Sequence, residues 1–456
     1  MKTYQFKAIL LNTGWLENAY ISINANGIIT NISQDKPLED VTEINGFALP
    51  GFQNAHSHAF QYGMAGLTEK HIGNGTSPDD FWSWREAMYQ LALTINPDQM
   101  QAIATMLYAE MARHGYTNVA EFHYVHHDKN GIPYTNLAEM GSRLIAAAET
   151  VGIGITLIPI FYQKGGFGQE PNKRQRRFIS STIDEYQKLL EASEIACKAY
   201  KHANIGIGIH SMRGVAPSNI AEIAKSGPQN MPFHIHVSEQ LKEIDDSIAY
   251  LGKRPVEWLI ENIDLNDRFH LVHATHLNEK ELLGIAKHKA NVVLCPSTEG
   301  NLGDGLFSLS KFQNANGKWS IGTDSHIGIN PLEELRILDY GQRLITHKRN
   351  TYYSNEQQDS GSYAIEMATI TGRKAMNNYN TAFFKVGEYL NACIIDASAP
   401  LLSTTSLKNL TSTIVYATDA TMQLGSIAYG KMSLNPQKYH NIKTEFAKTL
   451  YKLKNR

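Results

Sequence analysis

The chain has few cysteines, and they lie far apart. Its 456 residues include three, Cys197, Cys295 and Cys393, with no CxxC spacing. This argues against a disulfide framework and a structural zinc ribbon, and it fits a reducing compartment. Long apolar runs of the ~18 residues that span a membrane are also missing, and the segment MKTYQFKAILL lacks the features of a secretory signal. We therefore expect a cytoplasmic protein that does not bind a membrane.

An excess of charge of one sign is missing as well. The formal net charge is -2, with acidic and basic residues dispersed along the chain, so no electrostatic footprint for nucleic acid exists. The only basic cluster, KRQRR at 173–177, is interpreted as a solvated helix start. The apolar fraction of 42% and the charged fraction of 19% are typical of a globular enzyme with a substantial core.

Apolar segments that end in polar residues alternate with helical patterns through the middle of the chain. The eight apolar segments are 47–58, 117–125, 154–162, 205–213, 232–239, 268–275, 291–299 and 320–326. Residues 97–115 and 278–290 are two of the helical patterns between them, with Pro97 near a start and Gly115 at a stop. This alternation predicts a (β/α)8 TIM barrel over residues 49–380, with its chemistry at the carboxyl ends of the strands.

Strand-and-turn patterns flank this middle on both sides. Residues 1–48 contain TYQFKAIL and AYISINANGIITNIS, in which Asn26-Gly27 favours a hairpin turn. Residues 381–456 contain GEYLNACIID, STIVYA and GSIAYGKMSLN, which have the same style. The two terminal segments are therefore predicted to form a small β-sandwich domain, followed by a terminal helix.

Histidines and an aspartate at the predicted strand ends suggest a metal site. His56 and His58 lie two residues apart, so both point to one side of a strand. An HxH pair alone is equally typical of packed or solvated histidines. Together with His236 and Asp324 from other strand ends, however, it forms a nitrogen and oxygen set that suits one zinc ion. His234 lies one layer deeper and is predicted to pack.

The strand-end motifs resemble those of the amidohydrolase superfamily, in its mononuclear-zinc deaminase branch. These motifs are HSH, HIHVSE, VHATH and GTDSH. The resemblance implies a distorted barrel with one zinc and proton transfer by Glu239, His273 and Asp324. The strand-four segment IGIGIHSMR has no lysine to bridge two metals, which disfavours a binuclear site. The choice between zinc, iron and manganese stays open.

The loop segments resemble those of formimidoylglutamate deiminases within this superfamily. They include NAHSHAFQYGMAGLTE, FWSWREAMYQ, GYTNVAEFHYVHHD, STEGNLGDG and EELRILDYGQR, and the similarity weakens beyond about residue 380. The resemblance implies hydrolysis of N-formimino-L-glutamate to N-formyl-L-glutamate and ammonia in histidine degradation, by a homodimer. Matching the motifs residue by residue, it also implies a set of substrate contacts: Gln61, Arg85, Tyr124, His210 and Arg213.

Several interpretations remain in competition. A deaminase of nucleobases or chloro-s-triazines has the same metal motifs, although its substrates do not need paired arginines, and a barrel without metal or catalysis is the other alternative. Without the resemblance, Arg85 is interpreted as an arginine on a helix surface. The other conspicuous side chains are expected to pack or to lie in loops or beside the site: Trp82, Trp84, His123, His126, His127, Ser325 and His326.

Overall fold

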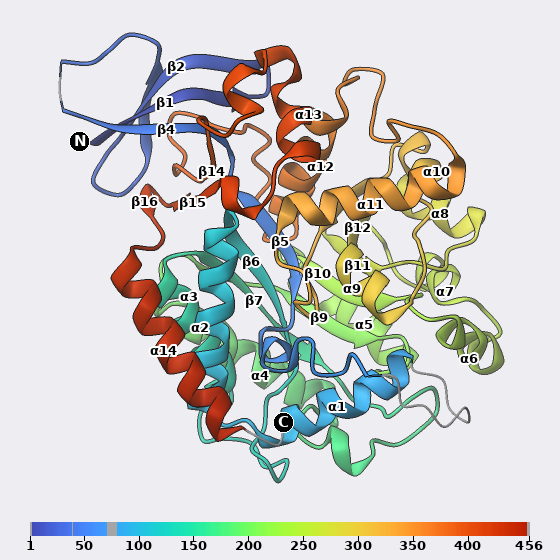
Figure 1. The fold of residues 1–456 in the computed structure, drawn as a ribbon. Coiled ribbons are helices and arrows are strands. Elements are labelled where there is room, and N and C mark those ends of the chain that lie inside the picture. The colour runs from blue at the N-terminus through green and yellow to red at the C-terminus, as the bar shows by residue number, and fades with distance from the viewer. Residues whose placement is uncertain (1, 39, 71–79, 454–456) are drawn as a thin grey trace.

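A parallel β-barrel forms the centre of the molecule (Figure 1). The computed structural model describes residues 2–38, 40–70 and 80–453. Each barrel strand pairs in parallel with the next, and the short β8 (Ala203–Ile205) adds to β7. The strands are β5 (Phe52–Ser57), β6 (Tyr116–His123), β7 (Gly154–Phe161), β9 (Ile207–Ser211), β10 (Phe233–Val237), β11 (Phe269–His273), β12 (Asn291–Leu294) and β13 (Lys318–Ile321). The predicted fold class is confirmed.

The barrel closes between its first and last strands through little more than one bridge. Ser57 pairs with Asp324, and the backbone N–H groups of Thr323 and Asp324 donate to the His56 carbonyl at 3.0 and 3.1 Å. Gly322 permits this approach, because a Cβ there would lie 2.7 Å from the His56 Cβ. Closure thus brings together two of the motifs expected to bind metal.

Helices cover the outside of the barrel. They are α1 (Phe81–Thr94), α2 (Pro97–Arg113), α3 (Glu139–Val151), α4 (Ile183–Cys197), α5 (Pro217–Ser226), α6 (Leu241–Leu251), α7 (Pro255–Asn262), α8 (Glu279–Lys287), α9 (Pro296–Leu302), α10 (Leu309–Asn314), α11 (Pro331–Thr346) and α12 (Ser360–Lys374), with the short turns η1 (Ala59–Met64) and η2 (Lys173–Gln175). The two helices predicted above are α2 and α8, and each begins with a capping box, from Asn96 and Asn278.

The terminal segments build a second, mostly antiparallel sheet in the order β16-β15-β14-β4-β1-β2-β3. The N-terminal strands are β1 (Lys2–Leu11), β2 (Gly14–Ile23), β3 (Ile29–Ser33) and β4 (Val41–Pro50), and the C-terminal ones are β14 (Ala392–Asp396), β15 (Gln423–Ala428) and β16 (Lys431–Met432). The terminal helix α14 (Pro436–Lys452) packs beside α2 (Figure 1). One apolar core is continuous from this sheet into the barrel.

Two expectations about strands are wrong. Residues 47–50 belong to β4 and not to the first barrel strand, because the chain leaves one sheet for the other at Gly51. STIVYA lies in α13 (Leu407–Ala417), between η3 (Leu402–Thr404) and η4 (Ala420–Met422). Leu410, Ile414 and Val415 are buried at helical spacing, and the helix packs on α11 and α12. Tertiary packing overrides the β-branched composition of this segment.

The basic segment 173–177 is not simply solvated, as the sequence suggested. Arg177 is 0% exposed, and its Nη1 donates to the carbonyls of Ala92 and Ile95 at the end of α1. Its Nε donates to the His127 carbonyl at 2.8 Å. The other members of the segment are partly or fully exposed, apart from Gln175. None of the helices in the described part of the chain has the length and hydropathy that a bilayer crossing requires.

Candidate metal centre and substrate cavity

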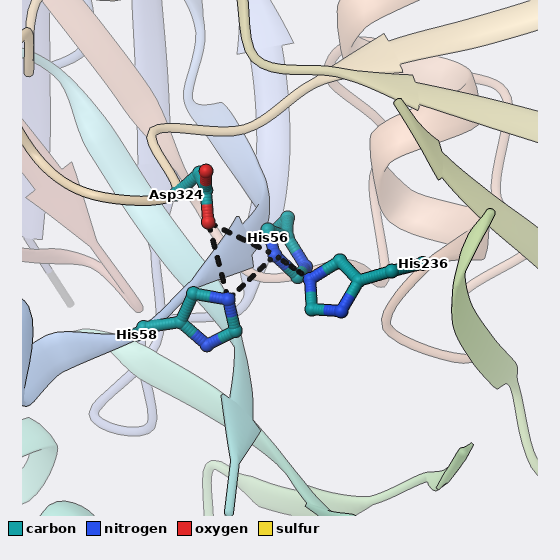
Figure 2. Close-up of side chains that lie close together, drawn as sticks. All are labelled: His56, His58, His236 and Asp324. Atoms are coloured by element: carbon teal, nitrogen blue, oxygen red, sulfur yellow. Dashed lines mark hydrogen bonds and ion pairs between the residues drawn. The ribbon is translucent and has the colours of Figure 1, made fainter. Parts of the chain in front are cut away.

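Three histidines and one aspartate converge at the carboxyl end of the barrel (Figure 2). The Nε2 atom of His56 lies 3.1 Å from that of His58 and 3.0 Å from that of His236. Asp324 Oδ1 lies 3.3 Å from His56 Nε2 and 3.1 Å from His58 Nε2. The four candidate ligand atoms all lie within 4.8 Å of one another, and all four residues are buried.

The hydrogen bonds behind this cluster fix which ring nitrogens carry protons. His58 Nδ1 lies 2.8 Å from the Phe122 carbonyl, and His236 Nδ1 lies 2.9 Å from the His210 carbonyl. A carbonyl only accepts, so both Nδ1 atoms are donors and both Nε2 atoms present lone pairs to the cluster. Lone pairs and a carboxylate that face one another in a buried space require a cation. The donor set fits a divalent metal of the zinc type.

The protonation of the cluster agrees with this reading. Burial lowers the pKa of His56 to about 3, so its imidazole is neutral and free to bind a metal. Burial alone would raise the pKa of Asp324, but the close approach of the His56 and His58 rings holds it well below its usual range. A neutral imidazole and an ionised carboxylate are the forms that a metal ion takes as ligands.

His234 lies outside the cluster, as its deeper position predicted. Its Nε2 lies 2.9 Å from the Ala375 carbonyl, and its ring stacks on His270 with centroids 4.8 Å apart. Burial lowers the pKa of His234 to about 4. This histidine is therefore a neutral packing residue in the lower layer of the barrel.

Glu239 and His273 lie beside the cluster. Glu239 Oε1 is 3.9 Å from His273 Nε2, and the Nδ1 of His273 is 3.2 Å from Glu299 Oε1. Burial opposes protonation of His273, but Glu239, Glu299 and Asp324 raise its pKa to about 10. A dication held by the neighbouring ligands would act in the opposite direction, because it disfavours a second positive charge.

Backbone strain accompanies this side of the site. His273 has φ +66° and Asp324 has φ +46°, in the left-handed region that residues with a Cβ rarely adopt. Each lies where a strand ends and the chain turns into a loop. Strain of this kind is concentrated at functional sites, where the surrounding packing holds it in place.

One cavity of about 540 Å³ opens over the cluster. It is lined by every predicted substrate contact, by the predicted proton-transfer residues and by all the candidate ligands except His56. The structure thus brings together residues from six barrel strands and from helix α1. From spacing in the sequence alone, only residues on the same strand could be predicted to lie side by side.

Two guanidinium groups face this cavity with unused donors. Arg85 Nε and Arg213 Nη1 are buried, and neither has a hydrogen-bond partner among the described residues. The Trp82 ring lies 4.5 Å from the Arg85 guanidinium carbon and 5.5 Å from that of Arg213. Arg85 is therefore not the surface arginine that its helix pattern alone suggested. Trp82 contributes a ring face to both cations.

Arg213 also faces two carboxylates. Its Nη1 lies 3.7 Å from Glu243 Oε2 and its Nη2 lies 4.0 Å from Glu239 Oε2. Both distances are too long for hydrogen bonds, so the guanidinium keeps donors for a ligand. Glu243 Oε2 accepts the Glu239 backbone N–H at 3.1 Å. The sequence motif ended at Glu239, but Glu243 follows four residues later, in the first turn of α6.

The other predicted substrate contacts form hydrogen bonds and ring contacts around the cavity. Gln61 Nε2 donates to the Tyr124 hydroxyl at 2.8 Å, and Gln61 Oε1 is buried without a partner among the described residues. His210 stacks on Tyr162 with centroids 4.1 Å apart. Burial, with Arg213 nearby, holds the pKa of His210 well below its usual value. His210 is therefore neutral.

The remaining histidines are held by neighbours outside the cluster. His126 Nε2 lies 3.1 Å from the Ile160 carbonyl and His127 Nε2 lies 2.8 Å from the Ile179 carbonyl, while His123 packs against His126. His326 Nδ1 lies 2.8 Å from Thr323 Oγ1. These contacts agree with the packing and loop roles expected for them.

Sequence reasoning missed four residues of the site. Glu299 orients His273, Glu243 faces Arg213, and Tyr89 and Tyr162 line the cavity. A signal existed for Tyr89, since it lies four residues after Arg85 and therefore on the same face of α1. Glu243 lies in the first turn of α6, Glu299 lies in α9 and Tyr162 follows β7, and only the tertiary structure places them at the site.

Comparison with known proteins agrees with this geometry. The model of the amidohydrolase family matches residues 47–441. The chain belongs to the amidohydrolase family. It is therefore a hydrolase that acts on carbon–nitrogen bonds. Formimidoylglutamate deiminase of Pseudomonas aeruginosa is 41% identical over 395 residues, which are 86% of each chain. The 5-methylthioadenosine/S-adenosylhomocysteine deaminase of Shouchella clausii is 26% identical over 392 residues, 82% of this chain and 79% of the relative.

Solved structures of the family have the same architecture. An amidohydrolase from Brucella melitensis superposes with a TM-score of 0.90 at 38% identity, over 99% of this chain and all of the other. An adenosine deaminase from Xanthomonas campestris, solved with bound zinc, superposes with a TM-score of 0.80 at 20% identity, over 100% of this chain and 98% of its own. The second likeness is one of fold alone.

Proposed function

We propose that the chain hydrolyses N-formimino-L-glutamate to N-formyl-L-glutamate and ammonia, with one zinc ion held by His56, His58, His236 and Asp324. The observation that carries the proposal is the pair of partly buried arginines beside the candidate metal ligands, each with one buried donor. Arg85 Nε and Arg213 Nη1 are donors without a partner among the described residues. They open on the same cavity as the metal ligands, so the site suits a substrate with carboxylates at one end and a hydrolysable C=N bond at the other.

The arginines set the class of substrate. A buried guanidinium donor without a partner costs stability, and a carboxylate satisfies it in a planar, bidentate pair. Gln61, Tyr124 and His210 supply further polar atoms on the same wall. A nucleobase offers no carboxylate to this wall and would leave the buried donors of both arginines without a hydrogen-bond partner among the described residues. The similarity to the formimidoylglutamate deiminase of Pseudomonas aeruginosa supports this choice of substrate.

The chemistry needs a nucleophilic water and two proton transfers. When bound, a divalent metal at the cluster supplies a water of lowered pKa at neutral pH. Water adds to the formimino carbon and loses its first proton to Asp324 or His273, while Glu239 donates a proton to the imine nitrogen. Glu239 then takes the proton of the added hydroxyl and donates it to the departing amine, and the proton held by Asp324 or His273 restores Glu239. In sum, C=NH and H₂O become C=O and NH₃.

The neighbours of these groups support the assignment. Glu299 accepts from His273 Nδ1 at 3.2 Å, which leaves Nε2 of His273 facing Glu239. Burial raises the pKa of Glu239, while His273 and Arg213 oppose the rise. A carboxyl group with a raised pKa is able to act as a general acid near neutral pH.

Ammonia release tests the proposal directly. The purified enzyme should release ammonia from N-formimino-L-glutamate with a kcat/KM at least ~100-fold above that on N-formimino-L-aspartate, guanine or cytosine, because the nucleobases have no carboxylate and the shorter aspartate chain displaces one carboxylate from the formimino carbon. Preference for guanine or cytosine would favour the alternative, a nucleobase deaminase. The absence of activity from zinc-loaded protein on all four compounds would favour a barrel without catalysis.

The cellular setting follows from the same proposal. The substrate and product place the chain in histidine degradation, and the three buried, unpaired cysteines fit the cytoplasm. We propose a homodimer by analogy with the resembling family. Sedimentation of the purified protein would test the oligomeric state, and a monomer at micromolar concentration would contradict it.

A further inference from the structure

Helix α1 turns one face toward the cavity. Phe81, Trp84, Arg85, Met88 and Tyr89 all line it, and their spacing of three and four residues places them on one side of the helix. Tyr89 follows Arg85 by four residues, and the Arg85 guanidinium carbon lies 5.4 Å from the centre of the Tyr89 ring. The helix therefore presents a cation and a phenol to the same part of the cavity.

The Tyr89 hydroxyl belongs to a short hydrogen-bonded chain. Gln175 Oε1 accepts the Asn172 N–H at 2.9 Å, so the amide of Gln175 is oriented and its Nε2 donates to the Tyr162 hydroxyl at 2.8 Å. The Tyr162 hydroxyl in turn interacts with that of Tyr89. Two neighbouring phenols have two protons, and a hydrogen bond between them would use only one. The other O–H can then donate to a ligand in the cavity that both side chains line.

The surroundings of this spare O–H are positively charged. Arg85 and Arg213 both act electrostatically on Tyr89, and the side chain is only 3% exposed. Burial raises the pKa of the Tyr89 hydroxyl, so it keeps its proton at neutral pH. A hydrogen bond to a charged acceptor is among the stronger ones. The acceptor that fits a donor between two guanidinium groups is a carboxylate.

We propose that Tyr89 is a specificity-determining residue, whose hydroxyl donates a hydrogen bond to a substrate carboxylate held by Arg85 and Arg213. The proposal rests on the function proposed above, and it adds a third, neutral donor to the two arginines that bind the carboxylate. Because the phenol is rigid and fixed by Tyr162, it selects the position of the carboxylate and not only its charge. Substrates that lack this carboxylate gain nothing from Tyr89.

The test replaces Tyr89 by phenylalanine, which keeps the ring beside Arg85 and removes only the hydroxyl. For N-formimino-L-glutamate, Tyr89→Phe should raise KM by ~10- to 100-fold while kcat changes by less than ~3-fold, the expected loss of one hydrogen bond to a charged group. Zinc content and melting temperature should match the wild type. The formimino derivatives of 4-aminobutyrate and of L-2-aminobutyrate each lack one carboxylate, and the substitution should leave KM unchanged for one of them.

A matched control is Tyr200→Phe. The Tyr200 hydroxyl is also buried and donates to the Ile153 carbonyl at 3.0 Å, but it does not line the cavity. Its loss should leave KM unchanged. An unchanged KM for N-formimino-L-glutamate in Tyr89→Phe, or an equal rise for both monocarboxylates, would overturn the role of Tyr89 alone. A wild-type enzyme that does not release ammonia from N-formimino-L-glutamate would overturn the proposed function together with this inference.

Discussion

His236 and Glu239 lie three positions apart in the sequence and have different proposed roles. His236 ends with its Nε2 3.0 Å from that of His56, inside the candidate metal cluster, whereas Glu239 lies 3.9 Å from His273 and outside it. The strand places His236 among the candidate ligands, and the turn after β10, with Ser238 at φ +53°, directs Glu239 to the cavity. Substitutions at the two positions therefore affect different steps.

We expect Glu239→Gln to keep the metal and to lower kcat by ~10²- to 10⁴-fold, because it removes a proton carrier. His236→Ala should instead lose the metal, because it removes a ligand. Metal analysis and ammonia release on the two purified variants test both statements. An empty site in Glu239→Gln together with a full one in His236→Ala would reverse the two assignments.

The proposed choice of substrate depends on the two arginines that line the cavity. Replacing Arg213 by methionine should leave the metal bound but lower kcat/KM on N-formimino-L-glutamate by at least ~100-fold, about 2.7 kcal/mol of transition-state binding. Arg85→Met should act in the same direction. Steady-state kinetics on the full substrate and on its monocarboxylate analogues measure the effect, and the analogue that lacks the affected carboxylate should lose less. Wild-type efficiency in both variants would contradict the choice of substrate.

At the scale of elements, the site depends on two connections between distant segments. Arg177 binds the carbonyls of Ala92 and Ile95 and so holds the end of α1, which carries Arg85 and Tyr89. The approach of β13 to β5 across Gly322 brings Asp324 to His56. Neither connection contains a residue that we expect to touch substrate.

The close approach of β13 to β5 at Gly322 leaves no room for a side chain, which can be tested by substitution. Gly322→Ala places a Cβ 2.7 Å from the His56 Cβ and 2.9 Å from the His56 backbone nitrogen, so the two strands must separate. We expect a loss of ~1–3 kcal/mol of stability and weaker metal binding, measured by thermal unfolding and by metal titration. Gly300→Ala, where a Cβ meets nothing within 4 Å, is the control. Equal behaviour of the two variants would show that the closure tolerates a side chain.

At the scale of the whole molecule, strands from opposite sides of the barrel contribute to one candidate metal site. The predicted ligands come from β5, β10 and the turn after β13. A ligand that binds only the folded state stabilises all the elements that hold it. The terminal sheet contacts the amino-terminal end of the same barrel. For example, the Tyr429 hydroxyl donates to Asn118 near the start of β6.

We expect one divalent metal per chain and a lower melting temperature after its removal. At a free metal concentration of ~1,000 times its Kd, binding adds about 4 kcal/mol to stability, so chelation should lower the melting point by several degrees and abolish ammonia release. Elemental analysis of protein purified without chelator gives the stoichiometry. Two equivalents per chain would contradict the mononuclear site.

Local pattern was enough to predict the barrel and its candidate ligands. Strand periodicity placed His56 and His58 on one side, and the polar strand ends indicated where the chemistry lies, because both signals act within a few residues. The same local signals failed at STIVYA, where β-branched residues lie in a helix, and at 47–50, where one apolar run serves two sheets.

The sequence by itself determined the class of fold, the metal motifs and, through its loops, the resemblance that suggested the substrate. Only the tertiary structure decided that Arg85 turns a buried donor to the cavity beside Arg213, that Arg177 holds α1, and that Glu299, Glu243, Tyr89 and Tyr162 surround the predicted residues. The physical reason is the distance along the chain over which each interaction acts. Backbone periodicity is set by neighbours along the chain, whereas the burial of a charge and the partner of a donor depend on segments that come together only when the barrel closes.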